Sequence, residues 1–125
     1  MSFVNHVTLL GNLANDPEMR YTSGGTPVTT FTLATNEPGS KDDSGERRSY
    51  PNFHRIVVWG KLAEACSQHL SKGRQVMLEG RIQYRSYEDK QGVSRKSTEI
   101  VSRNVQFLGG PRKDANSTDI AESGE

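Results

Sequence analysis

The segment Pro51–Gly60, with the sequence PNFHRIVVWG, decides how this chain is interpreted. β-Branched and aromatic residues dominate the segment, which predicts a β-strand. Side chains alternate between the two faces of a strand, so Phe53, Arg55 and Trp59 should point to one side. The even-numbered side is largely aliphatic and is expected to face the core. The odd-numbered side therefore combines two aromatic rings with a guanidinium group, which suits stacking of unpaired bases and binding of their phosphates.

A second predicted strand, Gln75–Tyr87, repeats this plan. Its odd-numbered face carries Arg81 and Arg85 and ends in the aromatic Tyr87, whereas Tyr84 is expected on the core-facing side. A single ring on such a strand is more often a partly buried sheet aromatic than a binding residue. Cations and rings on the non-core faces of two strands together favour one continuous surface for an unpaired polynucleotide.

The composition predicts one domain with a polar tail. The chain has 125 residues, of which 32% are hydrophobic, and a formal net charge of +1. Residues 1–110 contain 14 Lys and Arg against 11 Asp and Glu, and residues 111–125 contain 2 against 4. We expect a mildly basic domain over residues 1–110 and a disordered, mildly acidic tail over residues 111–125. The lone Cys66 and the absence of an apolar leader or membrane span favour a cytoplasmic protein.

The remaining segments predict a strand-rich chain with one helix. Leu10 is an apolar residue on the outer side of the first strand, which suggests an interface, and Gly11 suggests a bend. The segment Asn36–Arg48 is rich in loop-forming residues and is expected to be a long exposed connector. Further strands are expected at Asn5–Leu13, Val28–Thr35 and Ser94–Leu108, and the helix at Lys61–Leu70. Glu18–Tyr21 is expected to be only a short extended piece.

The residues do not favour a metal site, a cofactor or catalysis. Asp42 and Asp43 lie in the expected connector without a third ligand, and Cys66 and His69 lack a second pair. The three histidines, His6, His54 and His69, are scattered over two strands and the helix. An enzyme on this scaffold, such as a nuclease, would need clustered carboxylates or a nucleophile beside a base. We therefore expect no metal, no cofactor and no catalytic residues.

The order of the elements predicts the fold class. Three strands, one helix and two further strands match the all-β, five-stranded Greek-key barrel of the OB-fold, with the helix between strands three and four. That barrel binds ligands on its second and third strands, which would be Val28–Thr35 and Tyr50–Trp59. The second of these strands carries the outward aromatic residues.

Several blocks of this chain resemble the bacterial-type single-stranded DNA-binding protein family over residues 3–110. They are Val7–Leu13, Asp16–Glu18, Phe31–Thr35, Phe53–Glu64, Leu70–Gly73 and Glu79–Arg81. The resemblance implies a nucleoid-associated homotetramer that wraps single-stranded DNA in replication, repair and recombination. It implies base stacking on Phe53, Trp59 and Tyr87, and subunit contacts near His54, with His6 and Leu10 as further interface candidates. The expected phosphate-binding residues are Arg20, Arg55, Lys61, Lys72, Arg81, Arg85 and Arg95.

The chain departs from the family pattern in two places. Family members commonly carry a tryptophan in the loop after the second strand, where this chain has Pro38-Gly39, and Tyr50 is the candidate substitute. Family members of the cellular type end in an acidic tail tip closing on Pro-Phe, which recruits replication and repair proteins, whereas this sequence ends in Ala121–Glu125. Either the chain is a shortened form, or it is a natural variant that leaves recruitment to other proteins. An accessory barrel of a primosome or a recombination-annealing complex, acting mainly through protein contacts, is the alternative interpretation.

Overall fold

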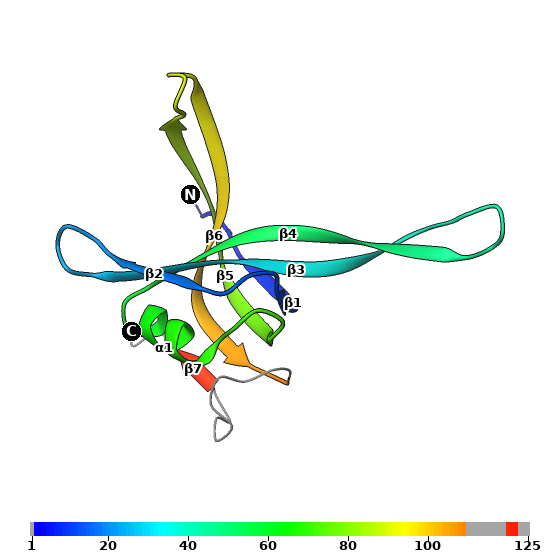
Figure 1. Cartoon of the computed structure of the whole chain (residues 1–125), viewed down its shortest axis with the longest axis horizontal. Helices are drawn as coiled ribbons and strands as arrows, with labels where there is room; N and C mark the ends of the chain where they lie inside the picture. The colour runs from blue at the N-terminus through cyan, green and yellow to red at the C-terminus, as the bar shows by residue number, and fades with distance from the viewer. Residues whose placement is uncertain (1, 110–119, 123–125) are drawn as a thin grey trace.

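A computed structural model describes residues 2–109 and 120–122 of the chain. Seven strands and one helix are present in this part of the molecule (Figure 1). The elements are β1 (Val7–Leu13), β2 (Glu18–Tyr21), β3 (Pro27–Lys41), β4 (Arg47–Trp59), α1 (Lys61–His69), β5 (Gln75–Glu88), β6 (Ser94–Phe107) and β7 (Ile120–Glu122). No helix among these residues is long and apolar enough to span a membrane.

Five of the strands form a closed barrel, which confirms the predicted fold class. The sheet order is β1-β5-β6-β4-β3-β2, and an additional pairing of β1 with β3 closes the circle. The β4–β6 contact is parallel, with Ile56 opposite Ile100, and all other pairings are antiparallel. The helix lies between β4 and β5, the third and fourth strands of the barrel when the short β2 is left out.

Gly11, the expected site of a bend, lies where β1 passes from one neighbour to the other. β1 pairs with β5 as far as Asn12, and with β3 at Asn12 and Leu13. A Cβ atom on Gly11 would lie 2.3 Å from the carbonyl oxygen of Ala34 on β3. The missing side chain therefore lets the two backbones approach closely enough to close the barrel.

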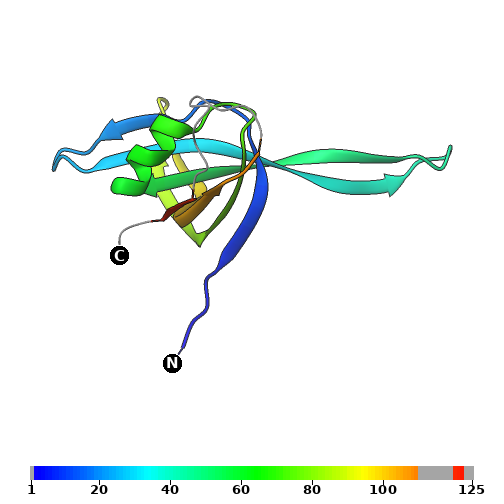
Figure 2. The same cartoon turned by 90° about the horizontal axis from the view of Figure 1, so that it is seen from below.

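The core fills the barrel and continues under the helix. Leu33, Ile56 and Leu78 from three strands are almost completely buried, and α1 adds Leu62 and Cys66. Burying a side chain of this size contributes about 1.5–3 kcal/mol, so this cluster provides most of the stability. Burial also raises the pKa of the Cys66 thiol to about 12, which keeps it protonated. Figure 2 shows α1 packed against the barrel.

Two long hairpins extend beyond the barrel, and one of them corrects the sequence interpretation. The expected connector Asn36–Arg48 is mostly strand, because β3 and β4 stay paired out to Lys41 and Arg47. A bulge after Pro38 accommodates the proline, and Gly39 lies so close to β4 that a Cβ would be 2.3 Å from the Arg48 oxygen. Cross-strand hydrogen bonds therefore override the local preference for a loop. We call the outer part of this hairpin, residues 34–53, the β3–β4 arm. The outer part of the hairpin formed by β5 and β6, residues 84–98, is the β5–β6 arm (Figure 1).

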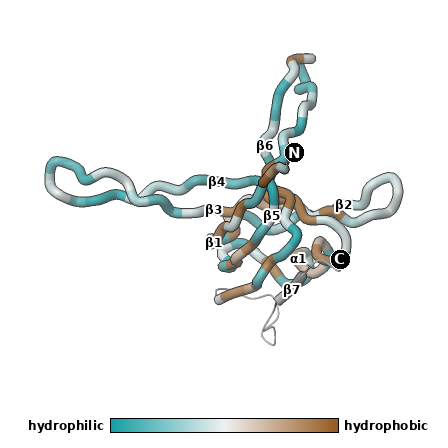
Figure 3. The backbone as a smooth tube through the Cα atoms, turned by 180° about the vertical axis from the view of Figure 1, so that it is seen from behind, coloured by the Kyte–Doolittle hydropathy of each residue, from teal (hydrophilic) through white to brown (hydrophobic). Residues whose placement is uncertain are grey.

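In the turn of each arm, an aspartate carboxylate accepts hydrogen bonds from residues a few positions later in the chain. Asp42 accepts hydrogen bonds from the Ser44 hydroxyl and from the Glu46 N–H, which lower the pKa of its carboxyl group. Asp89 accepts from the Val93 N–H and from Arg95, which lower its pKa in the same way. Both arms are mainly hydrophilic along their length, unlike the barrel (Figure 3).

Two further expectations differ from the structure. Tyr84, predicted on the core-facing side, is 70% exposed. The β5–β6 arm has left the barrel at this point, so neither face of the ribbon covers a core. Within the tail predicted to be disordered, Ile120–Glu122 form β7, which pairs with β6. Residues 110–119 and 123–125 lie outside the described part of the chain.

Candidate nucleic-acid interface

The outer face of β4 carries the aromatic residues that alternation predicted. Phe53 is 64% exposed and Trp59 is 46% exposed, whereas Ile56 and Val58 on the other face are buried. Val57 shares the outer face but is buried. The predicted separation of exposed rings from buried core residues along this strand is therefore confirmed. Val57 is the one aliphatic side chain between the two rings on that face.

Trp59 borders a hollow of about 490 Å³ on the outside of the barrel. Val28 and Val57 provide apolar surface beside the ring, and cationic and acidic side chains make up much of the rest. Strand register explains the grouping, since Arg20 on β2 lies opposite Val28, and Val28 lies opposite Trp59. The lining residues are Glu18, Arg20, Val28, Thr30, Arg55, Val57, Trp59, Gln83, Arg85 and Glu99.

A second hollow of about 310 Å³ continues the first toward the β5–β6 arm. It is lined by Arg55, Arg85, Tyr87 and Ser97. Arg55 and Arg85 line both hollows, so they connect the Trp59 ring to the Tyr87 ring, which is 44% exposed. We call the surface formed by Trp59, Arg55, Arg85 and Tyr87 the aromatic–arginine track.

Glu99 is the residue of this surface that the sequence analysis missed. It is 3% exposed, and it forms ion pairs of 3.1 Å with both Arg55 and Arg85. The hairpin register could have revealed it, since Glu99 lies opposite Gln83 and Ser97 lies opposite Arg85. Because Glu99 and Ser97 lie directly opposite Gln83 and Arg85, their side chains are on the same face of the hairpin as the predicted cations.

The other predicted phosphate-binding residues have different surroundings. Arg95 lies opposite Tyr87 and forms a 3.0 Å ion pair with Asp89. Arg81 donates a 3.3 Å hydrogen bond to Gln83 on the same strand. Neither of the two hollows is lined by Lys61, at the start of α1, or by Lys72. Lys72 lies in the loop after α1, where its backbone N–H donates to Asp16.

Phe53 and Tyr50 lie farther along β4 and do not line these hollows. Phe53 is opposite Ala34, beyond the Arg55–Thr32 pair as the strand leaves the barrel. Tyr50, the candidate substitute for the family's loop tryptophan, is opposite Glu37 and is separated from Phe53 by three positions. Alternation along a regular ladder places these two rings on opposite faces of the arm.

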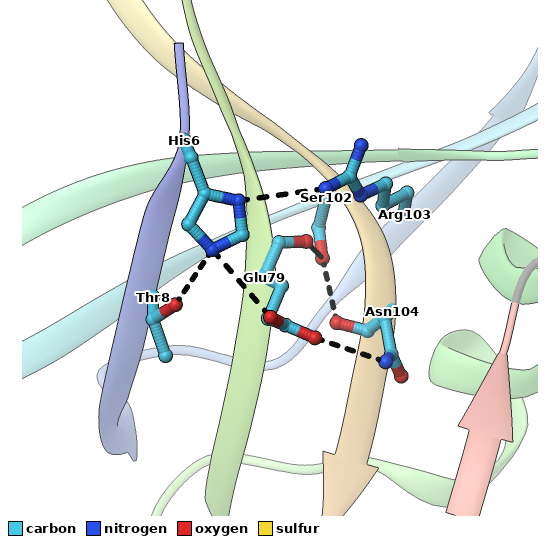
Figure 4. Close-up of polar contacts among 6 residues, drawn as sticks. All are labelled: His6, Thr8, Glu79, Ser102, Arg103 and Asn104. Carbon is cyan, nitrogen blue, oxygen red and sulfur yellow. Dashed lines mark hydrogen bonds and ion pairs between the residues drawn. The ribbon is translucent and has the colours of Figure 1, made fainter. Parts of the chain in front are cut away.

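The interface candidates occupy two separate places. Leu10 is 53% exposed on β1, opposite Met77 of β5. His6 lies on the same outer face, within 3.5 Å of Glu79 and 3.4 Å of Arg103 (Figure 4). His54 instead shares a 2.8 Å hydrogen bond with Thr35 across the β3–β4 pair. Among the described residues, no group of three or more His, Cys, Asp or Glu side chains is arranged to hold a metal ion.

Comparisons with known proteins agree on one family. The model of the single-strand binding protein family matches residues 4–108. A single-stranded DNA-binding protein 1 from Chlorobaculum tepidum is 50% identical over 96% of this chain and 74% of its own length. A protein of the same name from Xylella fastidiosa is 37% identical over all of this chain and 91% of its own.

Solved structures give the same result. The chain is similar to that in a structure described as the Plasmodium falciparum SSB complex with ssDNA, with a TM-score of 0.78 and 29% identity. This match covers 87% of our chain and 98% of the other. A deletion mutant of the Thermus aquaticus single-stranded DNA binding protein gives a TM-score of 0.72 and 32% identity, over 85% of our chain and 51% of that chain.

Proposed function

The chain belongs to the single-strand binding protein family, and we propose that it binds single-stranded DNA along the aromatic–arginine track. Bases would stack on Trp59 and Tyr87, and the phosphates between them would contact Arg55 and Arg85. The observation that carries this proposal is that two hollows, each bordered by one exposed ring, share the same two arginines. The proposed action is non-covalent binding and protection of DNA in replication, repair and recombination.

The physical chemistry of the track favours single strands of any sequence. Every base has a π-face, and stacking on an aromatic ring contributes about 1–3 kcal/mol per base. In a duplex the bases are already stacked inside the helix, so they cannot reach Trp59 or Tyr87. Arg20, Arg81 and Arg95 would extend the cationic surface around the track. Phe53 would stack a base farther along β4, and Lys61 and Lys72 would bind phosphates as the strand continues over the barrel.

Trp59 provides a direct test, because it is the only tryptophan of the chain. Stacking of a base on the indole should quench its fluorescence, so we expect emission to fall on titration with oligo(dT) at low salt. Added salt should reverse the quenching, since phosphate contacts release counterions. A duplex of similar length serves as the control and should leave the emission almost unchanged. Constant emission at saturating oligo(dT) would contradict stacking at Trp59.

We further propose that the chain acts as a homotetramer, with His6 and Leu10 in one subunit contact and His54 near another. The outer face of β1 and β5 supports the first contact, because it exposes Leu10 beside the partly buried Met77 and surrounds them with polar groups. An apolar centre surrounded by polar groups is the arrangement that protein–protein interfaces use, with an apolar core and a polar rim.

Leu10→Glu should weaken this assembly. A carboxylate at this position would be buried without a partner in the contact, which costs several kcal/mol. We therefore expect sedimentation velocity to show smaller species than the wild type at equal concentration. Val93→Glu, which replaces an exposed aliphatic residue just after the turn of the β5–β6 arm, is the matched control and should retain the wild-type assembly. If the wild-type chain sediments at its monomer mass of 13.9 kDa, with and without DNA, the proposed tetramer is contradicted.

A further inference from the structure

Glu99 is a nearly buried carboxylate in the middle of a surface proposed to bind a polyanion. One of its oxygens, Oε2, accepts a 3.1 Å hydrogen bond from Arg55 Nε. The same oxygen accepts bonds of 3.3 Å and 3.1 Å from Nε and Nη2 of Arg85. The carboxylate therefore holds two guanidinium groups, from β4 and β5, at one point.

This arrangement sets the position of both arginines before any DNA binds. Arg55 and Arg85 belong to strands that do not pair with each other, because β6 lies between β4 and β5 in the sheet. Glu99 is on β6 and bridges them. The side chains of the arginines remain 49% and 53% exposed. Each guanidinium has five N–H donors, so several remain for a phosphate.

The carboxylate also reduces the charge that DNA meets. Two guanidinium groups and one carboxylate carry a formal charge of +1, where the arginines alone would carry +2. A phosphate that binds Arg55 and Arg85 comes close to the negative charge of Glu99 and competes with it for the same N–H groups. Glu99 thus favours the correct geometry and opposes tight binding at the same time.

We propose that Glu99 is a positioning residue that holds Arg55 and Arg85 between the two stacking rings and limits the affinity of the track for single-stranded DNA. The inference rests on the proposed function, since it assumes that phosphates reach these two arginines. Its functional consequence is rapid exchange of DNA, because the Glu99 carboxylate competes with the phosphates and forms its ion pairs with Arg55 and Arg85 again when the strand dissociates.

Glu99→Gln tests the charge while nearly preserving the shape. The amide oxygen can still accept a hydrogen bond, but the negative charge is gone. Binding of a short oligo(dT), within the roughly 4–16 nucleotides that one OB-fold covers, is measured by Trp59 quenching over a range of salt concentrations. We expect affinity at low salt to rise by about threefold to tenfold. The slope of log K against log salt should steepen by about 0.7, the value for one additional phosphate of a single strand.

Two comparisons separate this effect from general changes in charge or stability. Glu64→Gln makes the same substitution at an exposed position of α1, and should leave affinity and slope close to wild type. The double variant Glu99→Gln, Arg85→Gln restores the formal charge of +1, and its slope should be steeper than that of Arg85→Gln alone by about 0.7. The comparison of the double variant with Arg85→Gln decides the question if Glu99→Gln by itself does not fold.

The possible failures have different meanings. Wild-type protein that binds oligo(dT) without quenching of Trp59 would overturn the proposed track itself. Normal quenching in the wild type, combined with a folded Glu99→Gln variant that binds no more tightly and with an unchanged slope, would overturn only the role of Glu99. Weaker binding by that variant at low salt would overturn the claim that Glu99 limits affinity, because the carboxylate would then affect binding only by positioning the arginines.

Discussion

Gly80→Ala is expected to lose several kcal/mol of folding free energy, a large part of the 5–15 kcal/mol that stabilises a typical domain. A Cβ atom at this position would lie 2.2 Å from the carbonyl oxygen of Val101 and 2.9 Å from the Cα of Ser102. Both are backbone atoms of β6, so relief requires moving the strand itself. The site is also where β5 and β6 shift register, with a bulge between Glu79 and Gly80. Such overpacking costs about 1–3 kcal/mol, and more where the backbone must move.

Chemical denaturation followed by circular dichroism measures this change, with Gly24→Ala as the matched control. Gly24 lies in the turn before β3, and the nearest atom to its added Cβ would be a side-chain oxygen at 3.9 Å. The control should therefore stay within about 0.5 kcal/mol of wild type. Equal stability of the two variants would mean that β6 can move away from Gly80 at little cost, and that the barrel is not closed as tightly as described here.

Replacing both Trp59 and Tyr87 with alanine is expected to cause the largest loss of DNA binding. Each ring borders one of the two hollows, and each stacked base contributes about 1–3 kcal/mol. The double variant should therefore bind oligo(dT) roughly 30-fold to 20,000-fold more weakly, if the two contributions add. Because both rings are more than two-fifths exposed, stability should change much less than affinity. Anisotropy of a labelled oligo(dT) measures binding without a tryptophan in the protein.

Tyr84→Ala is the matched control for Tyr87→Ala. Both tyrosines belong to the same strand and are exposed, but their positions differ by three residues, so they lie on opposite faces of the β5–β6 arm. Only the Tyr87 face carries Arg85 and the second hollow. Affinity should fall for Tyr87→Ala and remain near wild type for Tyr84→Ala. Equal losses in the two variants would contradict a track restricted to one face.

Local sequence was sufficient to predict the barrel, the helix and the outward rings. The two-residue period of Pro51–Gly60 separates Phe53 and Trp59 from Ile56 and Val58, because alternation belongs to the strand itself. Gly11 suggested a bend from the sequence alone, and the structure places this glycine where β1 changes its pairing partner. The roles of these rings and cations in DNA binding stay predictions until they are measured.

Sequence reasoning failed where the outcome depends on distant partners. Asn36–Arg48 has the composition of a loop, yet pairing across the β3–β4 arm makes most of it strand. Tyr84 fits the core-facing side of its strand, but the barrel ends before it and leaves the ring exposed.

The sequence by itself determined the fold class and the sorting of side chains along each strand, since both follow from local periodicity and turn chemistry. Only the tertiary structure decided that Arg55 and Arg85 meet at Glu99, because these residues come from three different strands whose order is set by closure of the barrel. The residues next to Glu99 in the sequence do not indicate that its carboxylate lies in the middle of the proposed DNA-binding surface. Its position depends on the register of β5 with β6 and on the parallel contact of β6 with β4.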